Sequence, residues 1–214
     1  MGRMWTLVLD TATPYLSLGL FRGEAGVGRV KRVERRHEEV LFGLLEEVLR
    51  EVGAGREEIG ALVLGEGPGS YTGLRIALAA GLGLAQALGA RVFGASSLLA
   101  ACWPYLKEGE PLTPLFTARN GLFYGATYTL EGGRPKEVAP PRKLKATELP
   151  REGRLLLDAP PDPRPLYDLL PFAHEGVAPP SLRTGKARAG ASEPRAAFYP
   201  FFRFPSPNWP REAP

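Results

Sequence analysis

Cysteine and histidine are scarce in this chain of 214 residues, which contains one cysteine and two histidines. The single Cys102 excludes an internal disulfide bond and favours a reducing cytosol. His37 and His174 lie far apart in the sequence, and no His, Cys or carboxylate side chains have the spacing of a metal-binding motif. We therefore expect neither a metal site nor the metallopeptidase chemistry that depends on one.

Long hydrophobic runs are also missing. Residues 76–90 are as long a stretch without a charged side chain as the sequence contains, and a membrane-spanning helix needs at least roughly 18 residues. The first residues lack the apolar core of a signal peptide. These two features predict a cytoplasmic protein without a membrane partner.

The basic excess of the chain is small. There are 27 lysines and arginines against 23 acidic residues, and residues 111–214 hold the surplus, with 15 basic against 10 acidic side chains. Such a surplus permits contact with nucleic acid without requiring it. The basic cluster at residues 29–36 is more typical of a solvated edge strand and helix start, so direct contact with RNA is left open.

The order of the patterns predicts an α/β protein with one large domain or two lobes, because 44% hydrophobic residues in 214 can bury a substantial core. Proline-rich and hairpin-like sequence begins after residue 105. We therefore expect an N-terminal lobe at residues 1–105 and a smaller, loop-rich lobe at residues 106–214. The expected strands are 5–9, 15–21, 27–33, 61–64, 92–94, 114–118, 122–130 and 154–157. The expected helices are 36–52, 74–88 and 97–104, and the expected hairpin turn is 119–121.

Residues 67–73 form the most informative motif, a glycine-rich loop between a predicted strand and a predicted helix. Glycines free the backbone and a helix N-terminus adds partial positive charge, so such a loop can hold an anion. The same loop can instead pack against another backbone. It is not a Walker loop, because no Gly-Lys-Ser/Thr follows at the required spacing. Side chains at Gly69 or Gly73 should destabilise the fold if φ is positive there.

The helices at 36–52 and 74–88 are apolar over wide arcs. Apolar residues of the first cover roughly 200°, where a single buried face requires about 100°. In the second, Ala77, Gly81 and Ala85 recur every four residues, which lets another helix approach closely. Burial in a two-layer lobe and a helix-mediated subunit contact both explain these patterns. The residues expected at such a contact are His37, Leu41, Leu45, Val48, Ala77, Ala80, Gly81 and Leu84.

Five short motifs together resemble the bacterial TsaB family, also called YeaZ. The resemblance covers residues 4–130 well, and beyond them only the last motif. It implies the actin-like, ribonuclease H-like fold of the superfamily of acetate and sugar kinases, chaperone ATPases and actin, with a reduced second lobe. The motifs are Asp10-Thr11, Arg36-His37-Glu38, the loop from Gly67 to Arg75, Ser96-Ser97-Leu98 and Tyr199-Pro200-Phe201-Phe202-Arg203.

The resemblance also implies a function. TsaB-type proteins help to place threonylcarbamoyl on the adenosine beside the anticodon of certain tRNAs, as non-catalytic partners of the catalytic paralogue TsaD, with the ATPase TsaE in the assembly. The helix-mediated contact described above could equally join two copies of the chain into a homodimer in the absence of the paralogue, and homodimer versus monomer is left open. We expect the chain to have no cofactor of its own, with ATP or ADP bound only in the complex. The nucleotide-facing residues would be Asp10, Thr11, Gly67, Gly69, Ser70, Thr72 and Gly73.

Two features depart from what the resemblance implies. Thr117-Ala118-Arg119 stands where the family usually has Asp-Ala-Arg, so one carboxylate is missing from the second lobe. The predicted turn at residues 10–14 lacks the glycine and the basic residue with which kinases of the superfamily grip phosphate. A nucleotide-dependent phosphotransferase that uses Asp10 and residues 67–73 is therefore the alternative rather than the main expectation.

Overall fold

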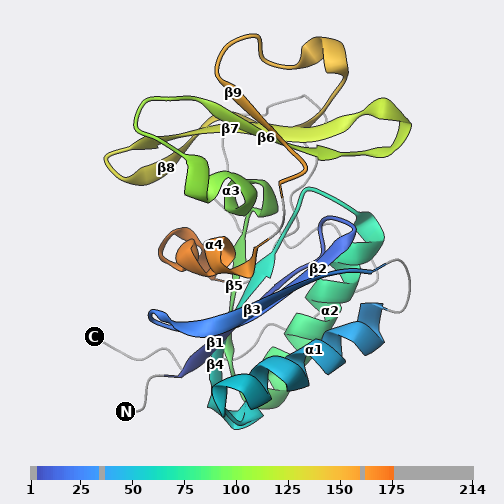
Figure 1. The fold of residues 1–214 in the computed structure, drawn as a ribbon, viewed down its shortest axis with the longest axis vertical. Coiled ribbons are helices and arrows are strands. Elements are labelled where there is room, and N and C mark those ends of the chain that lie inside the picture. The colour runs from blue at the N-terminus through green and yellow to red at the C-terminus, as the bar shows by residue number, and fades with distance from the viewer. Residues whose placement is uncertain (1–3, 34–36, 160–161, 176–214) are drawn as a thin grey trace, which may run out of the picture.

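The computed structural model of the chain describes residues 4–33, 37–159 and 162–175, which form two sheets with helices between and beside them (Figure 1). The larger sheet has six strands in the order β10-β5-β4-β1-β2-β3. Its strands are β1 (Trp5–Asp10), β2 (Tyr15–Arg22), β3 (Ala25–Arg32), β4 (Ile59–Gly65), β5 (Arg91–Ala95) and β10 (His174–Glu175). The first three are antiparallel neighbours, β4 and β5 run parallel to β1, and β10 pairs antiparallel with β5.

Helices cover both faces of this sheet. The long helices α1 (His37–Val52) and α2 (Tyr71–Leu88) lie on one face, and the short helix α4 (Pro163–Asp168) lies on the other (Figure 1). With both faces covered, all six residues of the central strand β1 are buried, as expected for a strand that reads as a continuous apolar run. Ser70 caps the N-terminus of α2, and Gly89, at φ 64°, ends it.

The smaller sheet has the order β8-β7-β6-β9. Its strands are β6 (Leu112–Thr117), β7 (Phe123–Glu131), β8 (Arg134–Leu144) and β9 (Arg154–Leu157). The predicted hairpin turn is confirmed between β6 and β7, where Asn120 and Gly121 adopt φ values of 61° and 67°. Helix α3 (Ser97–Cys102) lies between the two sheets and packs on β6 (Figure 1). The short 3-10 helices are η1 (Arg56–Glu58), η2 (Trp103–Tyr105), η3 (Arg119–Gly121), η4 (Ala146–Glu148) and η5 (Leu170–Phe172).

The second half of the chain does not stay in the second sheet. Helix α4 packs against β1 and β2, and β10 adds an edge strand next to β5, so residues 162–175 return to the first sheet. Where the chain divides into domains stays a prediction. None of the described helices is long and apolar enough to cross a membrane.

The main core lies between the first sheet and helices α1 and α2. The expectation that Leu41, Leu45 and Val48 face outward is wrong, because each is at most 1% exposed. The wide apolar arc of α1 has a simple cause, since the helix contacts the sheet on one side and α2 on another. Among the described side chains of α1, the large apolar one that is exposed rather than half-buried is Phe42, at 48%.

The row of small residues on α2 also faces inward. Ala77, Gly81 and Ala85 are buried, and a Cβ at Gly81 would lie 2.6 Å from a methyl carbon of Leu64. Small side chains here let the helix approach strand β4, so the row does not serve a second subunit. Ala80 and Leu84 are half-buried and pack on the same core, while the side chain of His37 is outside the described part of the chain.

Candidate functional site

The candidate site is built around Asp10, the last residue of β1. Its side chain is buried, with 8% of the residue exposed. The backbone N–H of Ala12 donates to Oδ1 over 2.7 Å, and the hydroxyl of Ser97 forms a second hydrogen bond to the carboxylate. Burial raises the pKa of Asp10 above its ordinary value, while the hydrogen bonds from Ser97 and Ala12 act in the opposite direction. The Asp10 carboxylate therefore already has hydrogen-bond donors from within the protein.

The glycine loop packs against the turn that follows Asp10. The backbone N–H of Ser70 donates to the carbonyl of Ala12 over 2.7 Å, and the hydroxyl of Thr11 donates to the carbonyl of Gly73 over 2.6 Å. A Cβ at Gly69 would lie 2.1 Å from the carbonyl oxygen of Ala12, and one at Gly73 would lie 2.2 Å from that of Thr11. Of the two sequence-based interpretations of the loop, the structure therefore supports packing against another backbone.

The reason for these glycines differs from the one considered in the sequence. Neither Gly69 nor Gly73 has a positive φ, whereas Gly67 does, at 82°. Gly69 and Gly73 are required because two backbone segments approach too closely for any side chain. Two hydrogen bonds join Gly67 to Ser97, the first residue of helix α3. The N–H of Gly67 donates to the Ser97 hydroxyl over 3.0 Å, and the carbonyl of Gly67 accepts from the Ser97 N–H over 3.0 Å.

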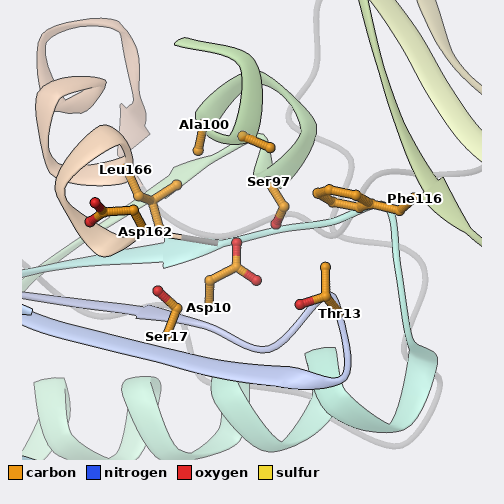
Figure 2. Close-up of a pocket in the computed structure, with 9 residues that line it drawn as sticks. Asp10, Thr13, Ser17, Ser97, Ala100, Phe116, Asp162 and Leu166 are labelled. Carbon is orange, nitrogen blue, oxygen red and sulfur yellow. The ribbon is translucent and has the colours of Figure 1, made fainter. Parts of the chain in front are cut away.

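Little space is left beside Asp10. The cavity there has a volume of about 10 Å³. That is room for about one water molecule, far less than a nucleoside triphosphate requires. Figure 2 shows the Asp10 carboxylate pointing toward Ser97, with Thr13 and Phe116 on one side of the cavity and Asp162 on another.

The structure brings most of the predicted nucleotide-facing residues together, but as packing partners of one another. Asp10, Thr11, Gly67, Gly69 and Gly73 meet where β1, β4 and α2 converge. The hydroxyl of Ser70 accepts from the N–H of Gly73 as the cap of α2, and Thr72 is exposed on the first turn of that helix. Whether any of them contacts a nucleotide in a complex stays a prediction.

Sequence reasoning missed two pairs. Asp158, just after β9, accepts hydrogen bonds from the backbone and hydroxyl of Thr117. Glu66, just after β4, pairs with His174, whose Nε2 lies 2.7 Å from Oε2 of the carboxylate. The members of each pair are 41 and 108 residues apart, so no local pattern could have joined them. Among the described residues, no group of three or more His, Cys, Asp or Glu side chains is arranged to hold a metal ion.

A family model described as "TsaD: tRNA N6-adenosine threonylcarbamoyltransferase" matches residues 31–154. The TsaB protein of Escherichia coli K12, described as a tRNA threonylcarbamoyladenosine biosynthesis protein, is 34% identical over 131 residues, covering 58% of this chain and 55% of its own length. TsaB of Bacillus subtilis 168 is 25% identical over 142 residues, covering 66% of this chain and 62% of its own length. The chain thus spans a little over half the length of these curated relatives.

Two solved structures share the fold. A Pseudomonas aeruginosa protein with similarity to peptidase YeaZ superposes with a TM-score of 0.74 at 24% identity, over 84% of this chain and all of the other. YeaZ from the same organism gives a TM-score of 0.69 at 22% identity, over 79% of this chain and 91% of the other. At this identity the likeness concerns the fold alone.

Proposed function

The chain belongs to the TsaD family of tRNA N6-adenosine threonylcarbamoyltransferases, as one of its TsaB (YeaZ) members with an actin-like fold, and from this we propose its function. It acts in the biosynthesis of tRNA threonylcarbamoyladenosine, as a non-catalytic, cytoplasmic partner of a TsaD-type paralogue. The relatives named TsaB support the pathway.

One observation supports the non-catalytic role above all others. The end of β1, where the superfamily resemblance would place a phosphate, is filled by the glycine loop, with Ser70 and Gly69 against the carbonyl of Ala12. A cavity of about 10 Å³ beside a satisfied Asp10 cannot accept the phosphates of ATP. Nucleotide bound at the end of β1 would therefore need surfaces that a partner completes. The phosphotransferase alternative has no comparable support.

The outer faces of α1 and α2 are the proposed contact with the paralogue. On α2 the exposed positions Arg75, Ala79, Gly83 and Gln86 lie on one stripe, in which Ala79 and Gly83 are small. A Cβ at Gly83 would have no neighbour within 4 Å. Beside α2, Phe42 of α1 exposes half of its surface. A partner helix can approach the stripe closely and cover Phe42, in the paralogue complex and in a homodimer alike.

A TsaE-type ATPase then joins the pair, and ATP or ADP is held only within that assembly. To test this, the tagged full-length chain is expressed with the TsaD-type and TsaE-type proteins of the same genome. We expect co-purification of the TsaD-type protein, and restored threonylcarbamoyladenosine in the tRNA of a bacterium depleted of its own TsaB, measured by nucleoside mass spectrometry.

Nucleotide titration separates the proposal from the alternative. We expect calorimetric titration of ATP or ADP into the isolated chain to give no saturable heat at millimolar nucleotide. Micromolar binding of ATP by the chain alone, together with turnover, would establish the phosphotransferase instead. Co-purification without restored tRNA modification would contradict the proposed pathway but not the contact.

A further inference from the structure

A second, much larger hollow opens between the two sheets. It has a volume of about 510 Å³, within the range of small-molecule sites, whereas the cavity at Asp10 holds about 10 Å³. Its floor is formed where β4 and β5 end, by Glu66 and by Ser96. The crevice outside the carboxyl ends of parallel strands is where open α/β sheets bind ligands. We call this hollow the inter-sheet groove.

A buried acid lies on the floor of the groove. Only 7% of Glu66 is exposed, and its Oε2 is 2.7 Å from Nε2 of His174, half of whose side chain is exposed. A Cβ at position 94 would lie 2.3 Å from Oε1 of Glu66 and 2.9 Å from Cε1 of His174. Glycine at position 94 therefore makes room for the pair, which brings a carboxylate and an imidazole into the groove.

The opposite wall carries polar groups of both charge signs. Tyr128 of β7 and Glu137 of β8 are direct partners in the antiparallel ladder, so their side chains share the face toward the groove. The hydroxyl of Tyr128 lies 3.2 Å from that of Ser96, and burial raises the pKa of the phenol, which keeps it protonated as a donor. Arg134, at the start of β8, adds a cation to the same wall.

An apolar surface completes the groove. Leu169 is buried, and Phe172, which is 42% exposed, packs against Trp103 with ring centroids 5.7 Å apart. A concave site with an apolar wall and a few convergent polar groups is the usual form of a small-molecule site. Here the polar groups include two carboxylates and a guanidinium, so a ligand with only one charge would leave part of the wall unmatched.

We propose that the inter-sheet groove binds a small zwitterion of the α-amino-acid class. The ammonium group lies between Glu66 and Glu137, the carboxylate is bound by Arg134 with the Tyr128 hydroxyl as a further donor, and the side chain packs on Leu169 and Phe172. This assignment does not depend on the proposed function, because none of these residues belongs to the outer faces of α1 and α2.

The test is calorimetric titration of the full-length chain with each of the twenty L-amino acids, and with ethylamine and acetate as singly charged probes. We expect at least one amino acid to bind with a stoichiometry of one, and both singly charged probes to bind at least tenfold more weakly. Arg134→Gln and Glu137→Gln should each weaken binding about tenfold or more, because each removes one charged hydrogen bond.

Lys136→Gln is the matched control. It removes a charge from the same strand, but Lys136 does not line the groove and forms an ion pair with Glu131. We expect binding to change less than twofold, with unaltered melting temperatures for all three variants. The proposal is overturned if no amino acid binds, if ethylamine or acetate binds as tightly, or if Lys136→Gln weakens binding as much as Arg134→Gln.

Discussion

The carboxylate of Asp158 accepts two hydrogen bonds from Thr117, one from the backbone N–H over 2.8 Å and one from the hydroxyl over 2.6 Å. Asp158 reaches this position with a φ of 44°, in the left-handed region that non-glycine residues seldom adopt. The resemblance to TsaB-type sequences implies an aspartate at position 117. In this chain the carboxylate at the end of β6 therefore comes from the end of β9.

Asp158→Ala should destabilise the second sheet. It removes both hydrogen bonds while the left-handed backbone remains, and we expect a loss of about 1 kcal/mol in the free energy of unfolding, because the pair is exposed. Urea denaturation measures the loss. Asp158→Asn retains an acceptor and tolerates the left-handed region, so it should lose less than half as much. No measurable loss in Asp158→Ala would show that the pair contributes little.

The close packing of the glycine loop on the β1–β2 turn gives a second prediction. Gly69→Ala and Gly73→Ala should each cost several kcal/mol of unfolding free energy, or prevent folding, because the new Cβ would lie about 2 Å from a backbone oxygen. Thermal melting and soluble yield report the effect.

Gly83→Ala is the control for that substitution. Position 83 is an exposed position of α2, and a Cβ there has open space, so we expect a gain of roughly 0.5–1 kcal/mol from helix propensity. A normal melting temperature in Gly69→Ala would mean that the loop does not rest on Ala12.

Much of the fold could be read from the sequence because local patterns encode it. The hairpin turn at Asn120 and Gly121 and the end of the second helix at residue 88 are short-range signals that the structure confirms. The sequence predicts the start of that helix at residue 74, whereas Ser70 caps a helix that begins at Tyr71. The sequence did not show which way the apolar side chains of α1 face. The arc of α1 shows that Leu41 and Leu45 are apolar, but not that α2 and the sheet together cover both sides of the helix.

The site was harder to predict, for a related reason. A glycine loop before a helix is compatible with an anion site and with backbone packing, and only the position of the Ala12 carbonyl decides between them. The groove depends on Glu66 and His174, which no periodicity connects. A contact between two polar residues far apart in the chain produces no local pattern in a single sequence.

The buried Asp10 predicts a dependence of stability on pH. Its pKa is raised in the folded state chiefly by burial, so the protonated form is favoured there, and stability from this group is lost as pH rises through the folded pKa. The contribution is complete below the ordinary value of 3.8. Asp10→Asn should therefore gain in stability relative to wild type as pH rises above that value.

Urea titrations from pH 3.5 to pH 8 measure this difference. Asparagine retains an acceptor for the N–H of Ala12, so the comparison isolates the charge. A difference between Asp10→Asn and wild type that stays constant over the whole range would contradict the raised pKa.

Metal analysis gives a further test. Since the described residues hold no cluster of three potential ligands, we expect no stoichiometric zinc or iron in the purified chain by elemental analysis. Incubation with EDTA should leave the melting temperature unchanged. One tightly bound metal per chain would require ligands outside the described residues.

The exposed stripe of α2 gives the sharpest prediction about association. Ala79→Glu places a charge on the outer face without entering the core, so we expect the chain to keep its circular dichroism and melting temperature. Pull-down of the TsaD-type paralogue should fall at least tenfold, because a carboxylate would be desolvated in a close helix contact. Leu45→Glu, at a position 1% exposed, should instead unfold the chain.

Val138→Glu is the matched surface control. Val138 is 53% exposed on β8, in the other sheet, and the same charge there should change neither stability nor pull-down. Homodimer formation, followed by analytical ultracentrifugation, should fail in Ala79→Glu together with paralogue binding, because both associations use one face. If Ala79→Glu binds the paralogue normally while Val138→Glu does not, the contact lies on the second sheet, and the outer faces of α1 and α2 are ordinary solvent-exposed surface.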